Sequence, residues 1–231
     1  MRNRNRIASL LISAVMLATT TPLSAIPTAT AETDMIYYIC PNSKLLRQDE
    51  AEYSEMVKGG KLLFNAASNE RESAQIIIAD PGKYQNFTMS LDGDFKCSSN
   101  DKTISKDNFE MFFESYLKVE GYWTLGGSHK DGNGKVSYDF YPDALIPYNM
   151  AVKEGKNSFE LNSSNLKNQG LWFTYTIPEN TEAGLYTATL NCTYTLNGKK
   201  TTSAIDVEIN VYDFELHTIT QNQTKFTAPF I

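Results

Sequence analysis

The sequence predicts an all-β protein built as a two-sheet antiparallel β-sandwich. Apolar and polar residues alternate along several segments, and helical periodicity is almost absent. Turn-forming residues recur about every ten positions, which is the spacing of short strands in a sandwich. Alternation with period two gives each strand one apolar and one polar face, and two such sheets pack their apolar faces together.

Alternation is clear in residues 109–119. One parity is apolar and predicts the buried face, while Glu110, Glu114 and Lys118 occupy the other parity, which we expect to face water. The apolar positions are Phe109, Met111, Phe113, Leu117 and Val119.

Residues 171–177 and 186–196 alternate in the same way. Pro178 ends the first strand because it cannot donate to a ladder, and Gly184 supplies backbone freedom before the second. Asn197-Gly198 predicts a tight hairpin into a return strand. In that strand the apolar parity flips between Val211 and Tyr212, which indicates a bulge or a change of packing partner.

Other segments complete the predicted sandwich. Shorter strands are expected at 35–40, 61–66, 73–80 and 87–91. Residues 48–58 predict one or two helical turns that end at Gly59-Gly60. Residues 121–147 are rich in Gly, Asp and aromatics and predict a long loop or hairpin excursion, a kind of segment that is often functional.

The N-terminus predicts export. Arg2, Arg4 and Arg6 precede a short apolar run, and Ala29-Thr30-Ala31 fits a signal-peptidase site, so we expect residues 1–31 to be removed after Ala31. The run is too short to span a membrane, and a secreted or cell-surface location follows. Loss of three arginines takes the formal net charge from −6 to −9, which disfavours nucleic acid as a partner.

Cysteine and histidine usage predicts neither a metal nor a cofactor site. Cys40 and Cys97 either form one disulfide or remain thiols, whereas the strand parity of Cys192 predicts a buried free thiol. His129 and His217 are the two histidines, and each stands alone in a polar stretch. A zinc site or a catalytic triad needs several such groups close together.

Four phrases, taken in order, resemble one family. "ASNERESAQIIIAD" at 67–80 resembles an Asn-Glu-x-x-x-x-Gln strand entry, and "YPDALIP" at 141–147 resembles a Pro-Asp-x-Leu-x-Pro loop. "LWFTYTIPENTEAGLYTATL" at 171–190 resembles a Trp…Pro…Gly-x-Tyr hairpin, and "VYDFEL" followed by "KFTAPF" resembles a last strand and the entry to another domain. Together they resemble the N-terminal domain of glycoside hydrolase family 123 and related glycosidase-like proteins. That domain would be an immunoglobulin-like or galactose-binding-like sandwich.

The resemblance implies a partner domain. In that family the sandwich precedes a (β/α)₈ barrel that acts on N-acetylgalactosamine glycosides through an adjacent Asp-Glu pair and the acetamido group of the substrate. This chain has no counterpart of the pair, because Asp49-Glu50 is far from any barrel position. We therefore expect a sandwich at 35–216, a linker or the start of a missing barrel domain at 217–231, and no catalytic residue. The chain is then either a fragment of a longer protein or a sandwich that works alone.

Binding and scaffold residues are predicted separately. Tyr122, Trp123 and Tyr141, in the aromatic-rich loop, are candidates to stack on sugar rings or to pack against a neighbouring domain. The alternative function is therefore a stand-alone carbohydrate-binding or adhesive cell-surface module, and a third is a cell-wall structural domain without a ligand. The residues expected to be structural are Asn69, Glu70, Gln75, Asp143, Trp172, Gly184 and Tyr186.

Overall fold

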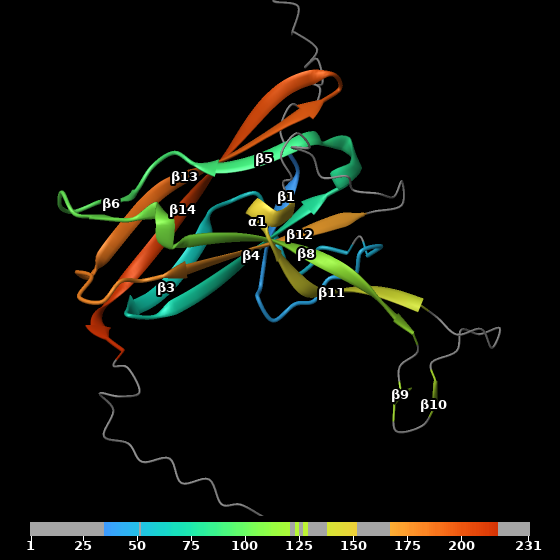
Figure 1. The fold of residues 1–231 in the computed structure, drawn as a ribbon, viewed down its shortest axis with the longest axis horizontal. Coiled ribbons are helices and arrows are strands. Elements are labelled where there is room, and N and C mark those ends of the chain that lie inside the picture. Colours follow the sequence, from blue (N-terminus) through green and yellow to red (C-terminus); the bar gives the residue numbers. More distant parts are fainter. Residues whose placement is uncertain are drawn as a thin grey trace, which may run out of the picture. The chain divides into compact units, whose positions relative to one another are not determined.

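The computed structural model describes residues 35–50, 52–120, 123–124, 127–128, 138–151 and 167–216. Nearly all of the regular structure in these residues is β-strand, which confirms the all-β prediction (Figure 1). The predicted signal peptide at 1–31 and the predicted connector at 217–231 lie outside the described residues. No helix in the described part of the chain is both long enough and apolar enough to cross a bilayer.

The first sheet has six antiparallel strands in the order β11-β8-β12-β4-β1-β2. Its strands are β1 (Tyr37–Cys40), β2 (Val57–Lys58), β4 (Arg71–Ala79), β8 (Phe109–Glu120), β11 (Tyr138–Pro147) and β12 (Asn168–Thr176). Strand β12 lies between β4 and β8, so the segment with the strongest alternation occupies the middle of this sheet.

The second sheet follows the order β3-β14-β13-β6-β7, and β5 also pairs with β13. Its strands are β3 (Leu62–Ser68), β5 (Gln85–Leu91), β6 (Phe95–Cys97), β7 (Thr103–Ile104), β13 (Gly184–Leu196) and β14 (Lys199–Glu215). Strands β3 and β14 pair in parallel, unlike the other pairs. Strand β3 turns through Asn69 into β4 at the end where β14 also finishes, so both strands run the same way.

The remaining elements are short. Strands β9 (Trp123–Thr124) and β10 (Gly127–Ser128) pair with each other. One-turn helices occur at η1 (Pro81–Lys83), η2 (Lys106–Asn108) and α1 (Tyr148–Ala151). Residues 121–147 were expected to form a long loop or a hairpin excursion. Residues 138–147 form β11, which pairs antiparallel with β8 and agrees with the hairpin alternative.

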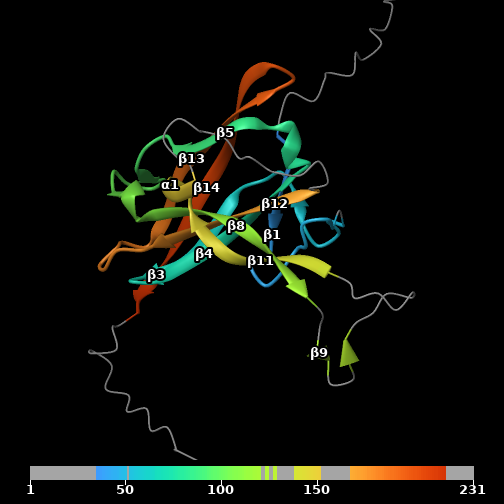
Figure 2. The same ribbon diagram turned by 45° about the vertical axis from the view of Figure 1, so that its right-hand side comes forward.

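The core lies between the two sheets, as the alternation predicts (Figure 2). The apolar parity of each long strand is buried there, and burial of one such side chain contributes roughly 1.5–3 kcal/mol. The fully buried inward residues of the central strands are Ile76, Leu171, Phe173, Tyr175, Leu190, Cys192, Tyr194, Val207 and Ile209. Leu117 shares the inward parity but is 44% exposed, because β8 continues beyond the region that the second sheet covers.

The outer face of the first sheet is covered in part by residues 41–56, and this corrects two expectations. Residues 48–50 and 52–58 form turns and the short strand β2 in place of helical turns, and Met56 packs there against a small cluster that contains Leu46 and Ile77. Tyr53 stacks on Tyr38 with ring centroids 4.2 Å apart. Glu114, expected to face water, is buried at this face.

All three cysteines are buried free thiols. The free state of Cys192 was predicted from its strand parity. The alternative of a Cys40–Cys97 disulfide is wrong. Cys40 belongs to the small cluster on the outer face of the first sheet, whereas Cys97 belongs to the core between the sheets, so strand β4 separates them.

Candidate functional site: the chain-exit surface

The turn at Asn69 fixes the point at which the chain leaves the sandwich. Asn69 has a φ of 63°, a left-handed conformation that asparagine adopts more readily than most residues. Its side-chain Nδ2 donates to the carbonyl of Leu216 at 2.6 Å. The amide of Leu216 donates to the carbonyl of Ser68 at 2.9 Å. The last described residue is therefore held on both of its backbone polar groups.

The same turn ties a third segment to this end of the sandwich. Ser68 Oγ donates to the carbonyl of Pro178 at 3.0 Å and accepts from the amide of Thr181 at 3.0 Å. The Glu70 carboxylate accepts from the amide of Ala67 at 2.7 Å, which closes the turn. In Figure 1 the red end of β14 lies beside the turn between β3 and β4, and Figure 2 agrees.

The side chains at the exit are apolar and exposed. Tyr212, Phe214 and Leu216 are 44%, 57% and 41% exposed, and we call these three residues the chain-exit surface. The rings of Tyr212 and Phe214 are parallel, with centroids 6.0 Å apart. The preceding outward residues of β14, such as Asp206, Glu208 and Asn210, are polar, so the outer face changes character at Tyr212.

The predicted parity flip has a structural basis. From Val211 to Glu215 the chain advances four residues along β14, while its partner β3 advances two, from Ala66 to Ser68. This register irregularity lies where a bulge was expected. Tyr212 and Phe214 face outward because they keep the parity of the preceding outward residues of β14. Exposed apolar residues grouped in this way are typical of a surface that packs on another chain or domain.

Two predicted scaffold residues lie at the start of β13, next to the turn that precedes it. Tyr186 is buried and its hydroxyl donates to the carbonyl of Glu182 at 2.9 Å. Gly184 has a φ of +157°, and a Cβ placed on it would lie 3.0 Å from Cys97 Sγ. Both residues hold the turn against the core.

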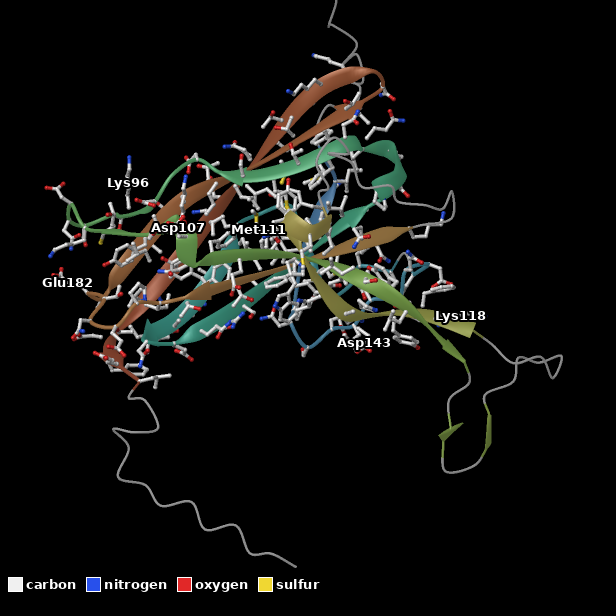
Figure 3. The ribbon with its side chains drawn as sticks, viewed as in Figure 1. Lys96, Asp107, Met111, Lys118, Asp143 and Glu182 are labelled. Carbon is white, nitrogen blue, oxygen red and sulfur yellow. The ribbon has the colours of Figure 1, made fainter. Side chains whose placement is uncertain are left out.

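The other predicted residues are spread over the first sheet. Gln75 is buried and its Nε2 donates to Glu114 Oε1 at 2.6 Å. Trp172 is half-buried on β12, opposite Gln75 on one side and Phe112 on the other. Asp143 is exposed at a register irregularity of β11, and Figure 3 shows it far from Glu182.

The three aromatic candidates for sugar stacking are not brought together by the described residues. Tyr122 is not among the described residues. Trp123 belongs to β9, and only its backbone is described. Tyr141 is half-buried on β11 and pairs in register with Leu117. Their role in binding stays a prediction.

An open hollow of about 420 Å³ lies on the outer face of the second sheet. Its acidic lining is Asp92, Asp94, Asp206 and Glu208, and Glu208 is engaged by Lys61 Nζ at 2.5 Å. Within the described part of the chain no three His, Cys, Asp or Glu side chains are grouped as metal ligands would be.

The sequence alone assigns no role to Ser68 or Phe214, and it predicts that Glu114 faces water. Ser68 carries no sequence signal, since its role depends on two turns that meet in space. Phe214 was visible as an out-of-phase apolar residue. Glu114 was assigned to the wet face because the covering segment at 41–56 is remote in sequence.

Comparisons with known proteins agree with this architecture. Residues 42–194 match the family described as the glycoside hydrolase 123 N-terminal domain. A family 123 glycoside hydrolase from Clostridium perfringens, studied for glycolipid glycan hydrolysis, has a similar structure, with a TM-score of 0.58 and 16% identity. The match covers 79% of this chain and 28% of that one, so the chain spans little more than a quarter of its relative's length.

A second similar structure is the CooA pilin subunit from enterotoxigenic Escherichia coli, at 13% identity over 73% of this chain and 97% of that one. Its TM-score of 0.30 is too low to carry an argument. A comparison with curated proteins finds no match. Because the family match covers more than half of its residues, the chain belongs to the family of glycoside hydrolase 123 N-terminal domains.

Proposed function

We propose that this chain is the non-catalytic N-terminal accessory sandwich of a secreted glycoside hydrolase 123-like protein that acts on N-acetylgalactosamine-containing glycans. Family membership supports the accessory role. The length difference from the Clostridium perfringens relative supports a further domain in the complete protein. The sugar rests on the resemblance of the sequence motifs, and secretion rests on the pattern of residues 1–31.

The chain-exit surface is the observation that carries this proposal. Leu216, the last residue before the expected connector, is held to the sandwich by Asn69 and Ser68. The rings of Tyr212 and Phe214 lie directly before that exit. A domain that follows in the same polypeptide would cover them, and burial of an exposed aromatic side chain on such a partner is favourable. The sandwich would thus orient the catalytic barrel rather than supply its chemistry.

The test compares two lengths of the protein. One form ends at Ile231, and the other continues through whatever the reading frame encodes next. We expect the longer form to hydrolyse an aryl N-acetylgalactosaminide and the shorter form not to do so. A Tyr212→Ser, Phe214→Ser double variant of the longer form should melt at a lower temperature, whereas Leu45→Ser, at an exposed site elsewhere, should not.

Two results would contradict the proposal. Hydrolysis by the shorter form would place the catalytic groups inside the sandwich. A stop codon after Ile231, together with retention of the chain on immobilised glycans that is lost in Trp123→Ala, would favour the stand-alone binding module.

A further inference from the structure

Gln75 and Glu114 form a buried polar pair on the outer face of the first sheet. Gln75 is 1% exposed on β4 and Glu114 is 4% exposed on β8, on either side of β12. Gln75 Nε2 donates to Glu114 Oε1 at 2.6 Å. The carboxyl of Glu114 reaches across β12, where a Cβ on Gly170 would lie 1.8 Å from Glu114 Oε2. Glycine at position 170 is therefore what admits the carboxyl to this place.

The hydrogen bonding of the pair is incomplete if Glu114 is ionised. Gln75 Oε1 and Glu114 Oε2 are buried and have no hydrogen-bond partner. Both atoms are acceptors in that state, because a carboxylate has no proton to donate. A buried acceptor without a donor is unfavourable, and a buried charge without a counter-ion is more so. No ion pair among the described residues includes Glu114.

A proton on the Glu114 carboxyl would give both of these oxygen atoms a hydrogen-bond partner. We propose that Glu114 is a proton-binding site of the folded domain, whose protonated carboxyl pairs with the Gln75 amide through two hydrogen bonds. Gln75 Nε2 donates to Glu114 Oε1, and Glu114 Oε2 donates to Gln75 Oε1. The proton is taken up from solvent when the domain folds and is returned when it unfolds.

The electrostatic surroundings agree with a neutral acid. Burial raises the pKa of Glu114 from 4.5 to about 7, and the bond from Gln75 offsets part of that rise. Cys40 of β1 and Tyr116 of β8 interact with it electrostatically, and Tyr53 of the covering segment interacts with Tyr116. Burial raises the pKa of all three, to about 12 for Cys40 and Tyr53.

Four charged groups of the covering segment form two ion pairs, and its other two, Asp49 and Glu52, are exposed. Lys44 pairs with Glu55 at 3.2 Å, and Arg47 lies 3.8 Å from Glu50. Asn168 on β12 is uncharged and accepts from the Tyr116 hydroxyl at 2.7 Å. Of the four titratable groups in this cluster, Glu114 is thus the one that changes charge between pH 4 and 9.

A raised pKa in the folded state makes folding pH-dependent in a defined direction. Between pH 4.5 and 7 the unfolded chain has lost this proton while the folded domain keeps it, so stability falls as the pH rises. Below this window both states are protonated, and above it both are ionised. A pKa difference of about 2.5 corresponds to a loss of about 300-fold in the folding equilibrium constant across the window.

The test uses Glu114→Gln, which places an amide nitrogen where the proposed acid carries its proton. The folding equilibrium constant of the full chain and of the variant is measured by urea unfolding from pH 4 to 9. The ratio of variant to native should rise about 150-fold between pH 4.5 and 8 and level off toward either end of the measured range. Glu110→Gln, at an exposed position on the same face of β8 where Glu110 pairs with Arg71, should not reproduce the rise.

A second measurement needs no variant. The ¹³C chemical shift of the Glu114 side-chain carboxyl, followed by NMR in the native chain, should titrate with a midpoint near pH 7. A midpoint near that of a free glutamate, or a flat ratio for Glu114→Gln, would overturn the proposal. If the variant does not fold, the midpoint in the native chain decides the matter in either direction.

Discussion

Two replacements of Asn69 separate two contributions to the stability of the domain. One is the hydrogen bond to Leu216, and the other is the left-handed backbone conformation at position 69. Asn69→Ala removes the hydrogen bond to the Leu216 carbonyl and places a residue with a Cβ at a φ of 63°. Asn69→Gly removes the same bond but tolerates that φ. The bond is exposed, so its loss costs about 0.5–1 kcal/mol. The left-handed conformation costs an alanine about 1–2 kcal/mol.

We therefore expect Asn69→Ala to lower the free energy of unfolding by about 2 kcal/mol and Asn69→Gly by about 1 kcal/mol. Asn197, with a φ of 51° in the β13–β14 hairpin, is the matched control. The alanine-minus-glycine difference should be similar at both positions. Hydrogen exchange of the Leu216 amide should accelerate in both Asn69 variants and stay unchanged in the Asn197 variants.

Urea unfolding gives the free energies, and mass spectrometry gives the exchange rate. If Asn69→Gly matches the native chain in both measurements, the side-chain bond does not hold the exit. If the Asn69 and Asn197 variants accelerate Leu216 exchange equally, the effect is global unfolding rather than release of the connector.

Three further predictions follow from single contacts. Gly170→Ala should destabilise the domain by about 1–3 kcal/mol, because the new Cβ would force the Glu114 carboxyl away. Thermal unfolding measures this loss, and a melting temperature equal to that of the native chain would contradict it. Tyr186→Phe should cost about 1 kcal/mol through loss of the bond to the Glu182 carbonyl, and an unchanged urea midpoint would show that this bond contributes nothing. A thiol reagent should label the native chain slowly, because all three thiols are buried. After unfolding without a reductant it should label all three cysteines, and labelling of one alone would reveal a disulfide.

Much of the sandwich could be predicted from local pattern. The strand that contains Ile205, Val207 and Ile209 alternates strictly, and a sheet with one buried face requires that alternation. The out-of-phase apolar residues at Tyr212 and Phe214 also signalled a change of environment, and the structure places them on the outer surface. These features depend on residues next to one another along the chain.

The remainder depends on contacts between distant segments. Residues 48–58 have no strong strand pattern, and Met56 packs against the cluster of Cys40, Leu46 and Ile77 on the outer face of the first sheet. The burial of Glu114 follows from the same cover and from the space left by Gly170. The role of Asn69 as the anchor of Leu216 joins positions 147 residues apart. A single sequence offers no local signal for such pairs.

The most direct test of the account is the accessibility of the chain-exit surface in the complete protein. Hydroxyl-radical footprinting with mass spectrometry would compare Tyr212 and Phe214 in the chain that ends at Ile231 and in the longer polypeptide, with Leu45 as the exposed reference. The account predicts that both aromatic residues are modified several-fold more slowly in the longer protein, while Leu45 is unchanged. Equal modification of Tyr212 and Phe214 in the two forms would contradict it.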